Sequence, residues 1–170
     1  MKSVSFTGHR PEKIAKWRDN PQATERSIRG ALAEEIVRLV AEGAEYFLCG
    51  MAPGVDLWAA DELLRLRAEG GIDKGVALAA VVPYEGFSRS FDAESKRLYE
   101  RVLEGAEVVV IMANHYHHAC YARRNRYLVD NADRVVAYYE GGRGGTRQTV
   151  DYARKQGKEV VNLHQPTLFD

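Results

Sequence analysis

Short apolar runs alternate with longer amphipathic segments along the whole chain, and this alternation constrains the fold more than any other feature of the sequence. Several runs are rich in β-branched residues and nearly continuous, as expected for parallel strands that are buried on both faces. Strands are therefore expected at residues 3–7, 45–49, 76–82, 107–112, 134–139 and 159–163. The pattern predicts an α/β fold with a mostly parallel sheet of about six strands.

The segments between these runs have the periodicity of helices. Ile28, Leu32 and Ile36 share one helical face, and Gly43 follows at a position typical of a helix end. Further helices are expected at residues 56–69, 91–105, 119–131 and 145–156. The length of 170 residues fits a single domain over 1–170, with 164–170 as a possible flexible tail.

Composition narrows the function classes. The formal net charge is zero, so the molecule as a whole does not indicate a nucleic-acid or membrane partner. Two cysteines form no zinc or disulfide pattern, and no apolar run reaches the length of a membrane span, so a cytoplasmic location is expected. Residues 34–73 hold three Lys/Arg against nine Asp/Glu, whereas residues 119–158 hold nine against four. The excess of positive charge in residues 119–158 therefore favours an anionic ligand.

Ligands of parallel α/β sheets bind beyond the carboxyl ends of the strands. That rule selects the loops at 8–11, 50–56, 83–91, 113–118 and 140–146. The first of them, "TGHRP", offers the titratable ring of His9 and the phosphate-pairing guanidinium of Arg10. A surface position for this pair is the alternative.

The second loop opens the stretch "CGMAPGVDLWAA", in which Gly50 and Gly54 flank a proline. Asp56 lies near the next helix start, where it either caps the helix or accepts hydrogen bonds from a ribose hydroxyl. Trp58 is expected in the core rather than as a base-stacking platform.

The last loop lies in "YYEGGRGGTRQTVDYA", which has four glycines in five positions. Glycine leaves no Cβ in the way of a ligand, and a helix start offers free N–H groups and the positive end of a dipole. An anion site is therefore expected here, and the alternative is a plain flexible turn. The loop is not a Walker A sequence. Its candidate phosphate contacts are Gly142, Gly144, Gly145 and Thr146, with Arg143 and Arg147 nearby.

Residues 115–120, "HYHHAC", invite a metal-binding interpretation, but they have no standard zinc-ligand spacing, so a solvated loop and no metal are expected. Arg124 and Arg126 follow. They are too close in register to share one helical face, so only one of them is expected to point into the cleft.

Taken together, "TGHRP", "CGMAPGVD" and "RNRYLVDNADRVVAYYEGGRGGTRQTVDYA" resemble the YpsA-type branch of the SLOG superfamily. This superfamily also contains the DNA-processing protein DprA, whose S-G-x-A-x-G-x-D segment the second motif resembles, and the Lonely Guy (LOG) proteins. The resemblance covers nearly the whole chain. It implies a Rossmann-like three-layer domain, self-association, and ligand contacts at Gly8, His9, Arg10, Gly50, Gly54, Asp56, Arg124, Asn125, Asp130, Gly145 and Thr146.

The chain departs from the LOG phosphoribohydrolases at one position. Their pattern P-G-G-x-G-T-x-x-E ends in a catalytic glutamate, and aligning Gly145-Thr146 with its Gly-Thr puts Thr149 at that position. LOG-type activity is therefore not expected.

Three functions remain open. The leading hypothesis is binding or sensing of a nucleotide-derived small molecule of the adenine nucleotide or ADP-ribose type, with no other cofactor required. The second is an enzyme that acts on the glycosidic or phosphate bond of a nucleotide, with His9, Asp56 and Glu85 as weak catalytic candidates. The third is DprA-like binding of single-stranded DNA.

The chain ends in "QPTLF", residues 165–169, which resembles the Q-x-x-L-F peptide by which bacterial proteins dock on the replicative sliding clamp. Gln165, Leu168 and Phe169 are the contacts that this resemblance implies. The alternative is an apolar clasp on the protein's own domain.

Overall fold

Six strands and five α-helices alternate over residues 1–166, which are the residues that the computed structural model describes. Their bounds are β1 (Ser3–Gly8), α1 (Pro21–Ala41), β2 (Tyr46–Cys49), α2 (Val55–Glu69), β3 (Ala77–Val82), α3 (Ala93–Gly105), β4 (Val108–Ile111), α4 (Cys120–Asp130), β5 (Arg134–Tyr138), α5 (Gly145–Lys155) and β6 (Glu159–Asn162). Two short 3₁₀ helices that the sequence pattern did not predict are η1 (Pro11–Lys13) and η2 (Phe87–Ser90). Each expected strand is present with its ends within one residue. Leu168 and Phe169 of the tail motif lie outside the described residues.

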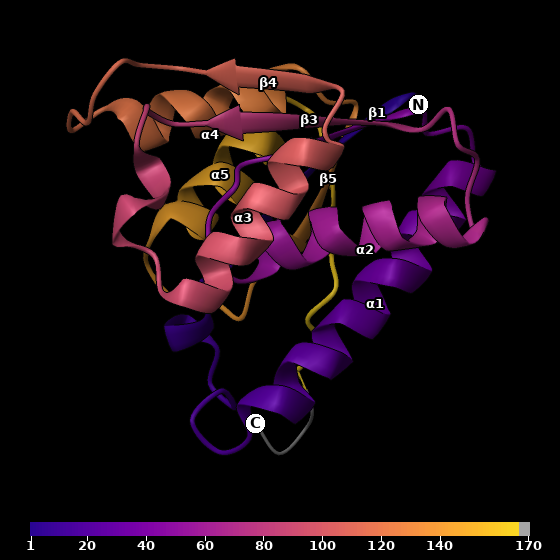
Figure 1. The fold of residues 1–170 in the computed structure, drawn as a ribbon, viewed down its shortest axis with the longest axis horizontal. Helices are drawn as coiled ribbons and strands as arrows, with labels where there is room; N and C mark the ends of the chain where they lie inside the picture. The colour runs from indigo at the N-terminus through magenta and orange to yellow at the C-terminus, as the bar shows by residue number, and fades with distance from the viewer. Residues whose placement is uncertain (167–170) are drawn as a thin grey trace.

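All six strands are parallel, in the order β4-β3-β2-β1-β5-β6. Figure 1 shows β3 and β4 side by side with their arrowheads pointing the same way. From β1 the chain moves outward to β4, and the α4 crossover then returns it to the other side of β1. The strand order therefore reverses between β1 and β5. In parallel α/β sheets such a reversal opens a crevice at the carboxyl ends of the strands.

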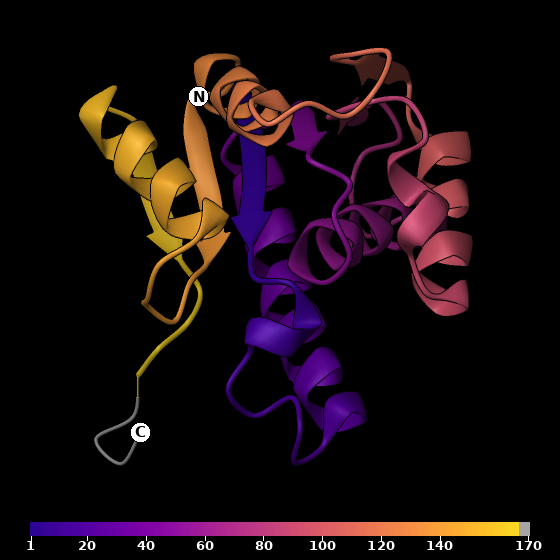
Figure 2. The same ribbon diagram turned by 90° about the vertical axis from the view of Figure 1, so that its left-hand side faces the viewer.

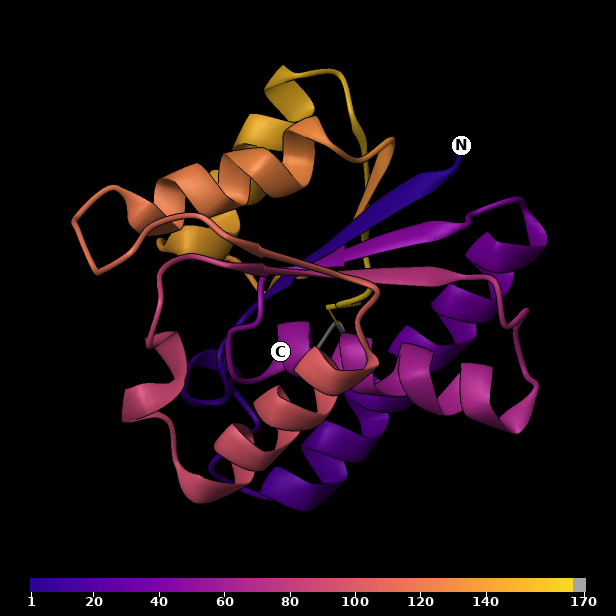
Figure 3. The same ribbon diagram turned by 45° about the horizontal axis from the view of Figure 1, so that its top comes forward.

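The sheet is the middle of three layers, with α1, α2 and α3 on one face and α4 and α5 on the other (Figure 3). Successive strand residues point to opposite faces, so Phe47 joins the core under α1 to α3 while Leu48 packs against Leu128 of α4. Trp58 is buried in the first of these cores, as predicted, and it stacks on Trp17 with 5.6 Å between the ring centroids. The expected Rossmann-like three-layer fold is confirmed.

The helix starts differ in how they are capped. The side chain of Asn20 accepts a hydrogen bond from the backbone of α1, and that of Asp92 does the same for α3. At α2 and α5 the N-cap residues are Gly54 and Gly144, which supply no side-chain cap. No helix within residues 1–166 is both long enough and apolar enough to span a membrane.

Candidate functional site

A cavity of about 440 Å³ lies where β1 and β5 end, and we call it the strand-end cavity. Figure 2 shows β1 beside β5 with both strands pointing toward the loops that border it. Its walls come from the loop after β1, the start of α2, the first turns of α4 and the glycine-rich loop before α5. The lining residues include Gly8, His9, Arg10, Lys13, Ala52, Asp56, Tyr121, Arg124, Asn125, Arg143, Gly144, Gly145, Thr146 and Arg147.

The start of α5 contributes unpaired donors to this cavity. Gly144 has a φ of +141°, which places it in the region that favours glycine, and it provides no cap. The first intrahelical bond runs from the N–H of Gln148 to the carbonyl of Gly144. The N–H groups of Gly145, Thr146 and Arg147 have no hydrogen-bond acceptor within residues 1–166. The helix therefore presents free donors and its positive dipole end to the cavity.

His9 adds a further donor. Its side chain is only 6% exposed, and its Nε2 accepts a hydrogen bond of 3.1 Å from the backbone N–H of Glu140. The ring proton must then sit on Nδ1, for which the described residues provide no partner. Every fully buried side-chain nitrogen or oxygen among those residues has a hydrogen-bond partner, so the unpartnered Nδ1 must be accessible. Because His9 lines the cavity, the accessible space next to Nδ1 is the cavity itself.

The pKa of His9 is lowered by burial. The carboxylate of Glu140 opposes this effect, and the positive charge of Lys13 adds to it. The ring is therefore neutral at pH 7, and its Nδ1–H serves as a neutral hydrogen-bond donor.

Cations dominate the lining of the strand-end cavity. The lining contains one carboxyl group, that of Asp56, and five basic side chains, which are those of Arg10, Lys13, Arg124, Arg143 and Arg147. Arg147 also lies 3.6 Å from Asp151, while Arg143 is exposed on the glycine-rich loop. The excess of positive charge next to a helix start suits a phosphate group.

Asp56 and Arg124 form the floor of the cavity, and both are buried. Burial raises the pKa of Asp56 to about 6, although the charge of Arg124 and a 3.3 Å hydrogen bond from the N–H of Ala52 lower it. Arg124 donates to the carbonyl of Gly50 and to Oδ1 of Asn125, the latter at 2.8 Å. The capping alternative for Asp56 is wrong, because its carboxylate accepts from Ala52, ahead of the helix, and the N-cap is Gly54.

The candidate glycines have different roles. A Cβ on Gly8 would lie 2.4 Å from the side chain of Val55, and one on Gly54 would lie 2.6 Å from the carbonyl oxygen of His9. These two glycines let β1 and α2 pack closely, so their lack of a side chain serves the fold. A Cβ on Gly145 would meet nothing nearer than Asn125 Nδ2 at 3.9 Å. The open space at Gly145 is therefore available to a ligand.

Other predicted site residues lie outside the cavity lining. Asp130 is exposed at the end of α4, where it accepts a 2.7 Å hydrogen bond from the hydroxyl of Tyr152. Gly142 is exposed, and its carbonyl accepts from the hydroxyl of Tyr139 at 3.1 Å. Glu85 is exposed in the loop after β3. The structure does not bring these three residues to the cavity, nor the backbone of Gly50, which instead holds Arg124.

Lys13 and Tyr121 line the cavity although the sequence analysis did not place them there. Lys13 reaches the cavity from η1, and its only sequence signal was a basic residue close behind the first strand. Tyr121 reaches it from the first turn of α4. Of the two arginines considered for the cleft, Arg124 lines the cavity, whereas Arg126 is exposed and lies over the ring of Tyr152 at 5.6 Å.

The histidine-rich loop shows no metal-binding geometry. Within residues 1–166 no group of three or more His, Cys, Asp or Glu side chains could hold a metal ion. Nδ1 of His117 accepts a hydrogen bond from the N–H of Ala119 at 3.2 Å, and Cys120 is buried at the start of α4.

The sheet order and the basic cavity at the strand reversal define a Rossmann-like protein with a candidate anion-binding site. A family model described as the YspA SLOG family matches residues 4–167, and the chain belongs to this family. It is 27% identical to a UPF0398 protein of Halalkalibacterium halodurans, over all of this chain and 90% of that protein. It is 23% identical to a UPF0398 protein of Bacillus cereus, over 96% of this chain and 88% of that protein.

Solved structures of DNA processing protein A share the fold. The Helicobacter pylori protein, described as having a unique single-stranded DNA binding mode, superposes with a TM-score of 0.67 and 15% identity, over 98% of this chain and 67% of that one. The Streptococcus pneumoniae protein superposes with a TM-score of 0.64 and 19% identity. This chain spans only 52% of the latter protein's length.

Proposed function

We propose that the protein binds a nucleotide or a nucleotide-derived small molecule, with a phosphate group held at the start of α5. The observation that carries this proposal is the meeting of two kinds of unpaired donor in one cavity. These donors are the uncapped N–H groups of Gly145 to Arg147 and the unpartnered Nδ1–H of His9, which reaches the cavity. Lys13 and Arg143 line the same space and add positive charge.

The floor of the cavity suits the sugar of such a ligand. The carboxylate of Asp56 is an acceptor, and ribose hydroxyl groups are donors that commonly pair with an acidic side chain in Rossmann-like folds. The side-chain amide of Asn125 lies between Arg124 and the Gly145 turn. A ligand with a phosphate at one end and hydroxyl groups at the other matches this order of donors and acceptors.

The substitution Gly145→Val tests the phosphate site. The valine side chain would occupy the open space in front of the helix start, and we expect the affinity for AMP, ADP and ADP-ribose to fall by about tenfold or more because several charge-assisted hydrogen bonds are lost. Isothermal titration calorimetry measures the loss. The matched control is Gly30→Val in α1, where an added Cβ meets nothing within 4 Å and the residue does not line the cavity. Unchanged affinity in a folded Gly145→Val protein would refute the phosphate site.

The LOG-type enzymatic alternative is tested separately. Thr149 takes the position of the LOG glutamate, and its buried hydroxyl donates a 2.8 Å hydrogen bond to the carbonyl of Gly145. A hydroxyl held in this way is neither an acid nor a base at neutral pH. We expect no release of adenine from AMP when the mixture is followed by chromatography. Robust release would contradict this and would make Asp56 the first carboxyl group to replace.

Binding of single-stranded DNA is the second candidate, favoured by the five basic side chains of the cavity and by the fold shared with DNA processing protein A. Salt dependence separates the two candidates. Affinity for a strand that contacts several phosphates falls steeply as salt rises, whereas a mononucleotide shows a shallow slope. Fluorescence anisotropy of a labelled oligonucleotide between low and physiological salt measures this slope.

A further inference from the structure

Three tyrosines gather beside the strand-end cavity, and we call them the tyrosine cluster: Tyr84, Tyr116 and Tyr121. Their ring centroids lie 5.5 to 6.2 Å apart in each pair. Tyr84 follows β3, Tyr116 follows β4, and Tyr121 lies in the first turn of α4. The cluster therefore continues the line of strand ends from the cavity toward the β4 edge of the sheet.

The members of the cluster differ in exposure. Tyr84 and Tyr121 are partly buried, and both pack on Phe87 of η2. Tyr116 is 57% exposed, although the rings of Tyr84 and Tyr121 both lie against it. Burial and the neighbouring hydroxyl of Tyr84 raise the pKa of Tyr121 to about 12, so its ring stays neutral. The cluster thus holds one exposed ring on a fixed aromatic base.

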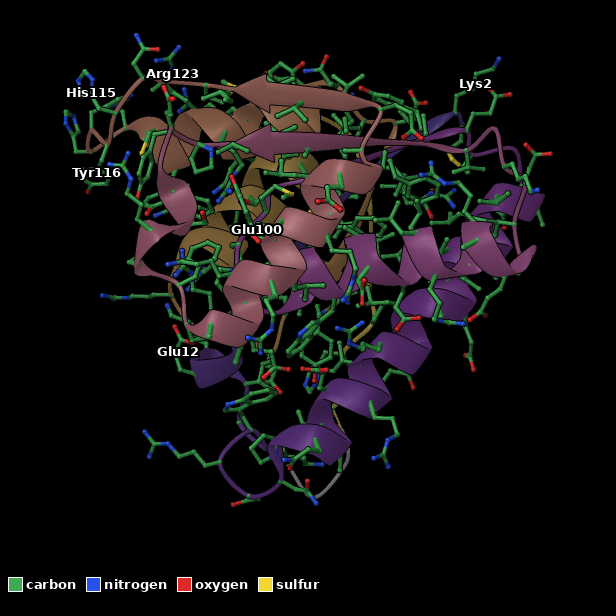
Figure 4. All side chains as sticks on the ribbon, in the orientation of Figure 1. Lys2, Glu12, Glu100, His115, Tyr116 and Arg123 are labelled. Atoms are coloured by element: carbon green, nitrogen blue, oxygen red, sulfur yellow. The ribbon has the colours of Figure 1, made fainter. Side chains whose placement is uncertain are left out.

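The segment that carries Tyr116 is basic, and the adjoining loop adds one carboxyl group, that of the exposed Glu85, whose backbone N–H donates to the carbonyl of Ala113. Figure 4 shows Tyr116, His115 and Arg123 together at the end of the molecule where β3 and β4 finish. No Asp or Glu occurs between Ala113 and Val129 in the sequence. An exposed aromatic ring next to positive charge is the arrangement that stacks a nucleic-acid base and attracts its phosphate.

The cluster is joined to the cavity but extends beyond it. Tyr121 lines the cavity, whereas Tyr84 and Tyr116 do not. The ends of β1 and β4 are three strand spacings apart, or about 14 Å. A single nucleotide whose phosphate lies at the start of α5 keeps its sugar and base within the cavity. A base on Tyr116 therefore belongs to a second nucleoside unit.

We propose that Tyr116 is a second, base-stacking subsite, which makes the preferred ligand two nucleoside units joined through phosphate. The first unit occupies the strand-end cavity, Tyr121 separates the two units, and the second base stacks on the exposed face of Tyr116. This inference rests on the nucleotide-binding function proposed above. Two sources supply the same chemistry: a 3′–5′-linked oligonucleotide and a pyrophosphate-linked dinucleotide.

Calorimetric titration of AMP, 5′-phosphorylated ApA and P1,P2-diadenosine diphosphate tests the subsite. We expect at least one two-base ligand to bind more tightly than AMP, and Tyr116→Ala to weaken that ligand by about fivefold or more while leaving AMP unchanged. Tyr116→Phe, the matched control, keeps the stacking ring and should retain the tighter binding. Whichever two-base ligand responds to Tyr116→Ala identifies the source.

Three results would overturn the subsite. In the first, neither two-base ligand binds more tightly than AMP. Another is an equal loss for AMP and the two-base ligands in Tyr116→Ala, which would assign the ring to the first base. The third is tighter binding that Tyr116→Ala does not reduce. Two other results would overturn the phosphate site on which the subsite depends. In one, AMP does not bind at all; in the other, AMP binds the Gly145→Val protein as well as it binds the wild type.

Discussion

Asp56 is a carboxyl group that water hardly reaches, and its titration links pH to stability. Burial raises its folded pKa from 3.8 to about 6, so between these values the folded protein holds a proton that the unfolded chain releases. The free energy of unfolding should therefore fall as pH rises from about 4 to about 6.

Asp56→Asn removes this titration. Relative to the wild type, the variant should gain stability between pH 4.5 and pH 7.5, by at most about 3 kcal/mol for a shift of about two units. Urea unfolding at both pH values measures the gain. A stability difference between the two proteins that is the same at both values would show that Asp56 titrates normally.

His9 has two separable hydrogen-bonding roles. Its Nε2 accepts from Glu140 and holds the glycine-rich loop, while its Nδ1–H faces the cavity as a donor. In His9→Gln the amide oxygen can replace Nε2, so the fold should be kept while phosphate affinity falls by about five- to tenfold. In His9→Asn the amide nitrogen can replace Nδ1, so phosphate affinity should be kept while stability falls by about 1–3 kcal/mol, because the N–H of Glu140 loses its acceptor.

Thermal unfolding and titration with AMP separate these outcomes. The opposite pattern, with affinity lost in His9→Asn and stability lost in His9→Gln, would place the proton on Nε2 instead. Nitrogen chemical shifts of the imidazole, measured by NMR on the wild type, report the tautomer directly.

At the level of elements, the close contact between β1 and α2 depends on Gly8. In Gly8→Ala the new Cβ would lie within 2.4 Å of Val55, so strand and helix must separate, and we expect a loss of about 1–3 kcal/mol in stability. Gly30→Ala in α1 is the matched control, because its Cβ meets nothing within 4 Å and alanine favours the helix by about 0.5–1 kcal/mol. Equal stability of the two variants in urea unfolding would contradict a packing role for Gly8.

Most of the elements and part of the site could be predicted from the sequence. Hydrophobic periodicity is local, so the β-branched runs predicted every strand and Gly145 marked a helix start. Contacts between distant segments carry no such signal. The bond from Glu140 to His9, the approach of Lys13 from η1 and the pairing of Tyr84 with Tyr116 follow only from the packed structure. The motif also suggested that Asp130 belongs to the site. In the structure Asp130 is exposed at the end of α4 and accepts a hydrogen bond from Tyr152 instead.

At the scale of the whole molecule, β4 leaves apolar surface uncovered. It is an edge strand that pairs only with β3 among the described residues, and Val108, Val109 and Ile111 are 39%, 47% and 52% exposed. β4 carries no charge, proline or bulge of the kind that blocks edge pairing. Two copies of such a strand can pair antiparallel about a two-fold axis, because each presents the same groups to the other. We therefore expect the self-association that the family resemblance implies to occur at this edge.

Val109→Lys tests this expectation by placing a charge in the middle of the edge. Sedimentation equilibrium over a range of concentrations should show a dimer for the wild type and a monomer for the variant, because the lysine cannot be buried unpaired against a second strand. Val37→Lys is the matched control, since Val37 is 40% exposed on α1, away from the sheet edge, and its replacement should leave the dimer intact. A Val109→Lys protein with the mass of the wild type at every concentration would rule out assembly through β4.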